Sequence, residues 1–102
     1  IFGDGTAIRD FVHVDDVIDA IVLAISSSSS FTCNIASGVS TSISDLAKTM
    51  ISLSHKEIKI IYKSSKPGEI LFSAADITFA KKNLSFNPKI SLKFGLEQFM
   101  SK

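Results

Sequence analysis

The chain has 102 residues, a net charge of +1 and a hydrophobic share of 45%. This length allows one small domain at most, the near-neutral charge argues against a nucleic-acid partner, and the hydrophobic share excludes a disordered chain. No apolar run is long enough to span a bilayer, so we expect no membrane partner.

The single cysteine, Cys33, lies among apolar residues and has no second cysteine with which to form an internal disulfide. This pattern fits a small core residue in a reducing compartment, so we expect a cytoplasmic protein. The chain begins with Ile1 instead of a methionine, and we therefore expect it to be a piece of something larger.

The first elements follow a turn near the start of the chain. The dipeptide Asp4-Gly5 predicts that turn, because glycine adopts positive φ without steric cost. Aromatic and β-branched residues between positions 11 and 14 predict a short strand. Asp15 and Asp16 then predict the start of a helix, because their carboxylates can accept hydrogen bonds from its unpaired N–H groups.

One cation, Arg9, stands between the predicted turn and the predicted strand. An arginine in this place can present its planar fork to a phosphate or a carboxylate. Spacing by itself favours the simpler interpretation, an exposed arginine beside a helix.

The predicted helix over Val17–Ile25 is apolar on almost every face, with Asp19 as the one interruption. A helix that is hydrophobic all round is buried on all sides. The amphipathic elements later in the chain can cover one side, whereas the other side requires a sheet that this chain does not contain. We therefore expect an incomplete domain.

The middle of the chain alternates connectors with short elements. The serine run Ser26–Ser30 predicts a flexible connector, and Phe31–Ile35 predicts a short buried strand. A helix is expected to begin at Ser42, whose spacing to Asp45 resembles a capping box. The loose alternation of apolar residues over Lys56–Lys63 predicts another strand.

Two further helices are expected after residue 75. Asp76 is the predicted cap of the first helix and Ser91 the predicted cap of the second. Phe86, in the turn between them, is expected to fill part of the core. The apolar stripe of the last helix is also expected to be core; it consists of Leu92, Leu96, Phe99 and Met100.

No combination of histidine, cysteine and acidic residues has the spacing of metal ligands. We therefore expect no metal site.

The run from Gly3 to Val17, GDGTAIRDFVHVDDV, resembles a segment of the extended short-chain dehydrogenase/reductase family. Members of this family are NAD-dependent nucleotide-sugar epimerases and dehydratases, with UDP-glucose 4-epimerase as the nearest type. The resemblance continues to the end of the chain. In the family this segment follows the catalytic half, so the resemblance implies the C-terminal part of such an enzyme.

The resemblance implies an α/β fold in two parts. Residues 1–25 would be the closing turn, strand and helix of a Rossmann-type dinucleotide fold, and residues 31–102 the small C-terminal nucleotide-sugar-binding subdomain. It also implies that NAD is bound by a missing N-terminal half, that the substrate is a nucleotide-diphosphate sugar, and that the parent protein is a homodimer. The chain on its own is expected to be inactive.

The loop Lys66-Pro67-Gly68-Glu69 resembles the family's Arg-x-Gly-Asp loop, whose arginine meets the nucleotide diphosphate and whose acid meets the ribose. Lys66 keeps the charge of that arginine but lacks its bidentate fork. Glu69 is one methylene longer than the family's aspartate. The resemblance therefore implies three substrate-binding residues, namely Arg9, Lys66 and Glu69.

Tyr62 and Lys66 reproduce the Tyr-x-x-x-Lys spacing of the family's catalytic pair. That chemistry requires a helix, on which residues four apart share a face and the ammonium lowers the pKa of the phenol. Pro67-Gly68 prevents a helix here, so we expect no catalytic residue in this chain.

Two alternatives to an epimerase stay open at this point. One is a catalytically silent module that binds a nucleotide-sugar or a partner protein without reaction. The other is a fragment of a nucleotide-sugar dehydratase or decarboxylase. The residues that decide between these reactions are expected upstream of this segment.

Overall fold

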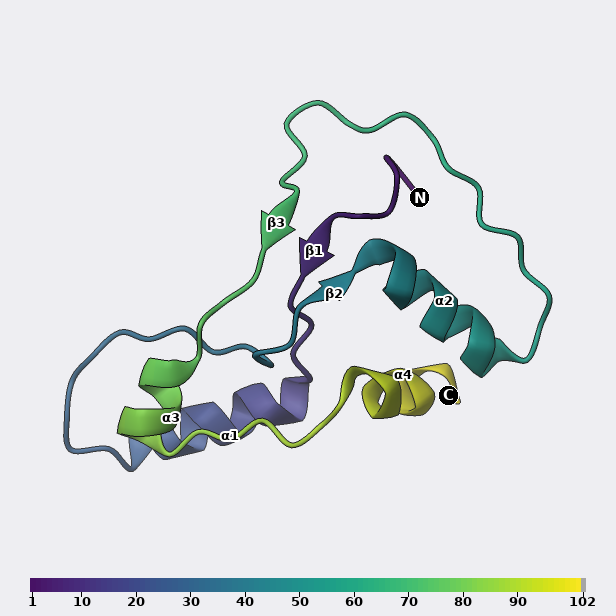
Figure 1. The fold of residues 1–102 in the computed structure, drawn as a ribbon. Helices are drawn as coiled ribbons and strands as arrows, with labels where there is room; N and C mark the ends of the chain where they lie inside the picture. The colour runs from purple at the N-terminus through teal and green to yellow at the C-terminus, as the bar shows by residue number, and fades with distance from the viewer. Residues whose placement is uncertain (102) are drawn as a thin grey trace.

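The computed structural model describes residues 1–101, which form four helices, a small sheet and long irregular connections (Figure 1). The radius of gyration is 16.2 Å, against about 13 Å for a closed domain of this length. The chain is therefore spread into a flat shape of 50 × 34 × 16 Å instead of closing around one core. The elements are β1 (Ile8–Arg9), α1 (Val14–Ile25), β2 (Thr41–Ser42), α2 (Ile43–Ser54), β3 (Phe72–Ser73), α3 (Thr78–Leu84) and α4 (Leu92–Met100).

The sheet has the strand order β2-β1-β3, with β1 antiparallel to β2 and parallel to β3. Each strand has two residues, and in β1 Arg9 lies opposite Thr41 on one side and Ser73 on the other. A separate parallel bridge joins Phe2 to Lys63. The sheet is too small to form a core, but it fixes the backbone of Arg9 between two neighbouring strands.

The core lies where α1, α3 and the segment before α3 meet (Figure 1). Ala80 is fully buried at its centre and Phe86 is 1% exposed, as predicted for that phenylalanine. Cys33 is a free thiol packed against this cluster, as its apolar neighbourhood indicated. The buried members are Ala20, Ala36, Ile77, Ala80, Leu84 and Phe86.

The opposite face of α1 is uncovered. Val14, Ile18, Ile21 and Ile25 follow the spacing i, i+4, i+7, i+11, which places them on one stripe of the helix, and each is between 49% and 79% exposed. The structure thus has the covered side and the uncovered side that the sequence predicted for this helix. Among residues 1–101, no helix combines the length and the hydropathy that crossing a bilayer requires.

Asp16, on the covered side of α1, is 2% exposed and ties distant parts of the chain together. Its Oδ1 accepts a hydrogen bond from the backbone N–H of Lys89 and its Oδ2 one from Ile90, each at 3.0 Å. The cap of α1 is instead His13, whose Nδ1 accepts the N–H of Asp15 at 3.0 Å. The predicted helix start at Asp15 and Asp16 was therefore two residues too late.

Two of the three predicted strands were placed wrongly, and the third is formed only at its end. Residues 11–13 are irregular and Val14 already belongs to α1, while the strand lies earlier, at Ile8–Arg9. Phe31–Ile35 has no regular structure, and within Lys56–Lys63 only Lys63 forms a bridge. Strand propensity is expressed only where a neighbouring strand offers its hydrogen bonds. Residues 11–13 and Phe31–Ile35 have no such neighbour among residues 1–101, and Ile61 and Lys63 pair only with the first three residues of the chain.

The helix caps were predicted better. The hydroxyl of Ser42 accepts the N–H of Asp45 at 3.0 Å, and that of Ser91 accepts the N–H of Phe94 at 3.2 Å, which confirms both caps. The N-cap of α3 is Ile77, one residue after the predicted Asp76. The carboxylate of Asp76 still accepts a hydrogen bond from the N–H of Thr78, the first residue of α3.

The α4 stripe is less buried than predicted, because Phe99 is largely exposed while Leu92, Leu96 and Met100 are half-buried. The stripe faces α2 and a cavity that the described residues leave open.

Candidate functional site

Arg9 is half-buried in the central strand β1. Its Nη1 donates a hydrogen bond to the carbonyl oxygen of the preceding residue, Ile8, at 2.7 Å. Among residues 1–101, no carboxylate forms an ion pair with this guanidinium. The arginine therefore keeps donors that a phosphate or a carboxylate can accept.

The segment Lys66-Pro67-Gly68-Glu69 is a β-turn, in which the N–H of Glu69 donates to the carbonyl of Lys66 at 3.3 Å. Gly68 has φ +77°, and a proline followed by a residue of positive φ is typical of a type II turn. Glycine is needed here for its backbone conformation alone, because a Cβ at Gly68 would meet no atom within 4 Å. The turn presents Lys66 and Glu69 at its two ends.

This turn lies against the beginning of the chain. The Nζ of Lys66 is 4.2 Å from the centre of the Phe2 ring, a cation–π contact. The Oε2 of Glu69 is 3.6 Å from the position that a Cβ on Gly3 would occupy. Lys66 and Glu69 are thus brought together around the Gly3–Gly5 turn.

The turn at Gly3–Gly5 is itself held by a local network. Oδ1 of Asp4 accepts the N–H of Thr6 at 3.0 Å and its hydroxyl at 2.6 Å. The bond from the Thr6 hydroxyl, followed by that from the N–H, holds the pKa of Asp4 below its ordinary value. A carboxylate at this position is therefore ionised at neutral pH.

A depression of about 250 Å³ separates the two turns. Its polar groups come from Asp4, Ser65 and Glu69, and its floor includes Ala7 and Ile43. Arg9 is not among its lining residues but lies two positions beyond Ala7, at the far end of β1. Of the three predicted residues, only Glu69 lines this depression. Lys66 is at the other end of the same β-turn, and Arg9 lies apart from both, in β1.

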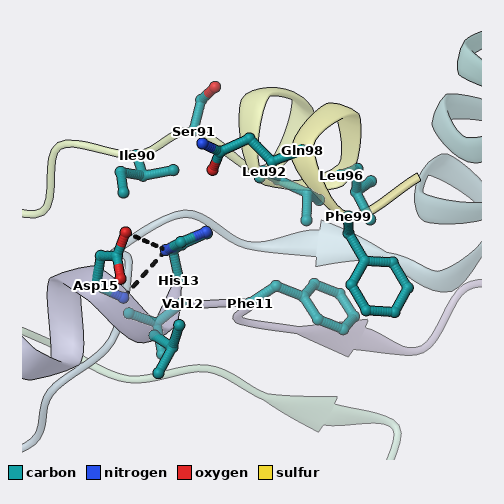
Figure 2. Close-up of a pocket in the computed structure, with 12 residues that line it drawn as sticks. Phe11, Val12, His13, Asp15, Ile90, Ser91, Leu92, Leu96, Gln98 and Phe99 are labelled. Carbon is teal, nitrogen blue, oxygen red and sulfur yellow. Dashed lines mark hydrogen bonds and ion pairs between the residues drawn. The ribbon is translucent and has the colours of Figure 1, made fainter. Parts of the chain in front are cut away.

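A larger cavity of about 490 Å³ lies between residues 11–15 and α4 and contains none of the three predicted residues. Figure 2 shows the rings of Phe11 and Phe99 at one end of it, and His13 with Asp15 at the other. The polar side chains that line the cavity are His13, Asp15, Ser91 and Gln98, and the other side chains that line it are apolar. A surface of this kind suits an apolar partner better than a charged diphosphate.

Tyr62 and Lys66 do not lie on a helix, because the whole segment from 56 to 71 is irregular apart from one bridge. Tyr62 and Lys66 therefore do not share a helix face, as the Pro67-Gly68 dipeptide predicted. Within residues 1–101, no group of three or more histidine, cysteine, aspartate or glutamate side chains is placed to hold a metal ion.

Asp10, the residue after Arg9, holds a distant loop but was not among the predicted site residues. Its Oδ1 accepts the N–H of Ser37 at 2.8 Å and the Ser37 hydroxyl at 2.7 Å, and its Oδ2 accepts the N–H of Gly38 at 2.9 Å. Its position directly after Arg9, the predicted binding residue, was the one feature of the sequence that could have drawn attention to it. Its partners lie 27 and 28 residues away, and no local pattern identifies them.

Over residues 1–99 the chain matches the protein family described as GDP-mannose 4,6-dehydratase. It superimposes on UDP-glucose 4-epimerase of Thermotoga maritima, solved with UDP-glucose, with a TM-score of 0.90 and 37% identity, covering 95% of this chain and 31% of that one. For UDP-glucuronic acid 4-epimerase of Bacillus cereus, solved with UDP-glucuronic acid and NAD, the TM-score is 0.86 at 36% identity, covering 95% and 32%.

Among curated relatives, putative GDP-L-fucose synthase 2 of Arabidopsis thaliana is 34% identical over 99 residues, which are 96% of this chain and 30% of the relative. The chain thus spans about a third of the length of the relatives it matches. The solved neighbours are Rossmann-fold enzymes, which confirms the predicted α/β fold class.

Proposed function

Because the chain belongs to the GDP-mannose 4,6-dehydratase family of extended short-chain dehydrogenases/reductases, we propose that it is the C-terminal, substrate-binding portion of a UDP-sugar 4-epimerase. In this proposal the chain holds the nucleotide and the diphosphate of the substrate. The groups that react with the sugar belong to a catalytic half that this chain does not contain. The division into residues 1–25 and 31–102 remains part of the proposal.

The observation that carries the proposal is the meeting of the turn at 66–69 with the turn at Gly3–Gly5, at the entrance to β1. Lys66 supplies a point charge for a phosphate. Glu69, half-buried beside the depression, supplies an acceptor for a ribose hydroxyl. Arg9, whose guanidinium has no acidic partner among residues 1–101, provides the fork for the diphosphate.

The uncovered apolar surfaces support the proposed missing half. The stripe of α1 and the larger cavity share Val14, so the two surfaces are continuous. Exposed apolar patches of this extent mark a surface that another part of a protein covers. We propose that the dinucleotide-binding half covers it. The homodimeric parent and the cytoplasmic location remain predictions.

The proposed cofactor is NAD, which is present in the Bacillus cereus neighbour. Dinucleotide sites of this fold hold the pyrophosphate on a glycine-rich turn that opens a helix. In this chain the turn with Gly3 and Gly5 leads into β1. The N-cap residues of α1 to α4 are His13, Ser42, Ile77 and Ser91, and no such turn precedes them. Residues 1–101 therefore do not fit NAD, and we assign it to the proposed N-terminal half.

Isothermal titration of the chain tests these assignments. UDP-glucose is expected to bind, because this chain contains the proposed diphosphate contacts. NAD alone is expected to give no stoichiometric binding, because residues 1–101 contain no glycine-rich turn that opens a helix. Tight NAD binding, or no heat with UDP-glucose at millimolar concentrations, would contradict the proposal.

A GDP-sugar dehydratase is the second candidate, favoured by the description of the matched family and by the GDP-L-fucose synthase relative. The same titration with GDP-mannose separates the two. Binding of GDP-mannose in preference to UDP-glucose would favour the second candidate.

A further inference from the structure

We propose that Asp10 is a positioning residue for nucleotide-sugar binding. Its carboxylate clamps the loop Ala36–Gly38 onto the end of β1 and so holds Arg9 in register. The inference rests on the proposed function, in which Arg9 binds the diphosphate.

The clamp consists of three hydrogen bonds to one carboxylate. Ser37 donates both its N–H and its hydroxyl to Oδ1, and Gly38 donates its N–H to Oδ2, at distances between 2.7 and 2.9 Å. Hydrogen bonds to an ionised acceptor are about twice as strong as neutral ones. This is the densest set of side-chain hydrogen bonds between distant segments in residues 1–101, since the carboxylate of Asp16 accepts two.

The loop that Asp10 binds is itself fixed to the core. Ala36 is 5% exposed and belongs to the buried cluster. Gly38 has φ +77°, and a Cβ built on it would lie 2.9 Å from Cδ1 of the buried Ile77, so its backbone approaches the core closely. Asp10 therefore connects the end of β1 to the rigid part of the molecule.

Apart from this clamp, Arg9 is held in the described part of the chain only by the short sheet and by one side-chain hydrogen bond. The neighbouring strands β2 and β3 have two residues each, so they supply a short ladder. The guanidinium bonds only to the carbonyl of its own neighbour, Ile8, among residues 1–101. A displacement of about 1 Å in a positioning group is enough to weaken a directional contact, and the clamp limits such a displacement.

Asp16 provides a matched control. It is also a carboxylate that accepts backbone N–H groups from a distant segment, but its partners are Lys89 and Ile90, in the segment before α4, and it lies on α1 instead of beside Arg9. Asp10→Asn and Asp16→Asn should both lower the melting temperature. In each variant a backbone N–H that donates to a carboxylate oxygen would face the NH2 group of asparagine, which is itself a donor. Only Asp10→Asn should weaken the affinity for UDP-glucose, by roughly 3- to 10-fold per folded molecule.

The experiment is isothermal titration with UDP-glucose below the melting temperature of every variant. The variants are Asp10→Asn, Asp16→Asn, Arg9→Ala and the double variant Arg9→Ala/Asp10→Asn. If Asp10 acts through Arg9, the double variant binds no more weakly than Arg9→Ala, because the effects of coupled residues do not add. Ser37→Ala, which removes one bond of the clamp, gives a milder variant should Asp10→Asn fail to fold, and is expected to weaken binding about twofold.

The outcomes distinguish failure of the proposed function from failure of the proposed role of Asp10. If the unmodified chain does not bind UDP-glucose, or Arg9→Ala binds it normally, the proposed function is wrong and this inference is overturned with it. If Arg9→Ala weakens binding but Asp10→Asn and Ser37→Ala do not, the inference alone is overturned. Equal weakening by Asp16→Asn, or additive losses in the double variant, would also overturn it.

Discussion

The core around Phe86 and the segment from residue 56 to residue 73 are both rich in apolar side chains, yet they fold in different ways. In the core, α1, α3 and the loop before β2 bury their apolar groups against each other. In the segment 56–73, every residue except Ile60 and Glu69 is exposed. Apolar composition alone therefore does not create a core, because the partners must also be present in the chain.

Two of the three proposed substrate-binding residues lie in the exposed segment 56–73. Lys66 and Glu69 belong to the open segment, held by one turn and by contacts to the start of the chain. Arg9 lies between the two regions, tied to the core through Asp10. A binding loop with few packing contacts is easier to adjust than a core residue.

The largest expected difference is between two phenylalanines. Phe86→Ala should lower the free energy of unfolding by about 3–5 kcal/mol, because the side chain is 1% exposed and its removal leaves a cavity. Phe72→Ala should cost less than about 0.5 kcal/mol, because this ring is 67% exposed. Urea unfolding followed by circular dichroism measures both, and equal losses would break the comparison.

Removing the buried carboxylate of α1 should have the next largest effect. Asp16→Ala leaves the N–H groups of Lys89 and Ile90 without their acceptor and should cost about 1–3 kcal/mol. Asp19, one turn further along α1, has an exposed side chain, so Asp19→Ala is the matched control and should be close to neutral. Urea unfolding measures both variants. An unchanged free energy of unfolding in Asp16→Ala would show that Asp16 does not stabilise the core.

Within the open segment, the turn at 66–69 can be loosened separately. Gly68→Ala places a Cβ at φ +77°, which costs about 1 kcal/mol. The amide of Glu69, which closes the turn, should then exchange with solvent about fivefold faster, since 1 kcal/mol is a factor of about five. Gly68→Asn, which tolerates positive φ, should exchange at an intermediate rate. Unchanged exchange in Gly68→Ala would show that the turn is not held as described.

The smallest effect concerns acid pH. The pKa of Asp76 is held below its ordinary value, mainly by the hydroxyl of Thr78 and then by its N–H. A lowered pKa in the folded state adds stability above the pKa of the unfolded chain, near 3.9, and this stability is lost as the pH falls through the folded value. Asp76→Asn should therefore lower the melting temperature slightly at pH 7 and not at pH 2.5. An equal shift at both pH values would contradict this assignment.

The sequence predicted the features that depend on neighbouring residues. The caps at Ser42 and Ser91 and the absence of a helix at Pro67-Gly68 are local effects, in which a side chain or a backbone restriction acts within a few residues. The apolar faces of α1 were also predicted, because helical period alone decides which residues share a face.

The rest depended on contacts that no local pattern contains. The strands were misplaced because each is two residues long and exists only through pairing with distant segments. The carboxylate of Asp10 meets Ser37 across 27 residues, and that of Asp16 meets Lys89 across 73. The three proposed binding residues came from a family resemblance, and their roles remain proposals.

The most direct test of the account is the affinity of Arg9→Ala for UDP-glucose, measured together with its melting temperature. If Arg9 holds the diphosphate, the dissociation constant should rise by about 10- to 100-fold, corresponding to about 1.5–3 kcal/mol, with little change in melting temperature. Arg9→Lys should recover part of the loss and Lys66→Ala should lose less, because a point charge does not reproduce the fork. An unchanged dissociation constant with a lowered melting temperature would mean that Arg9 only stabilises the sheet, and would contradict the proposed site.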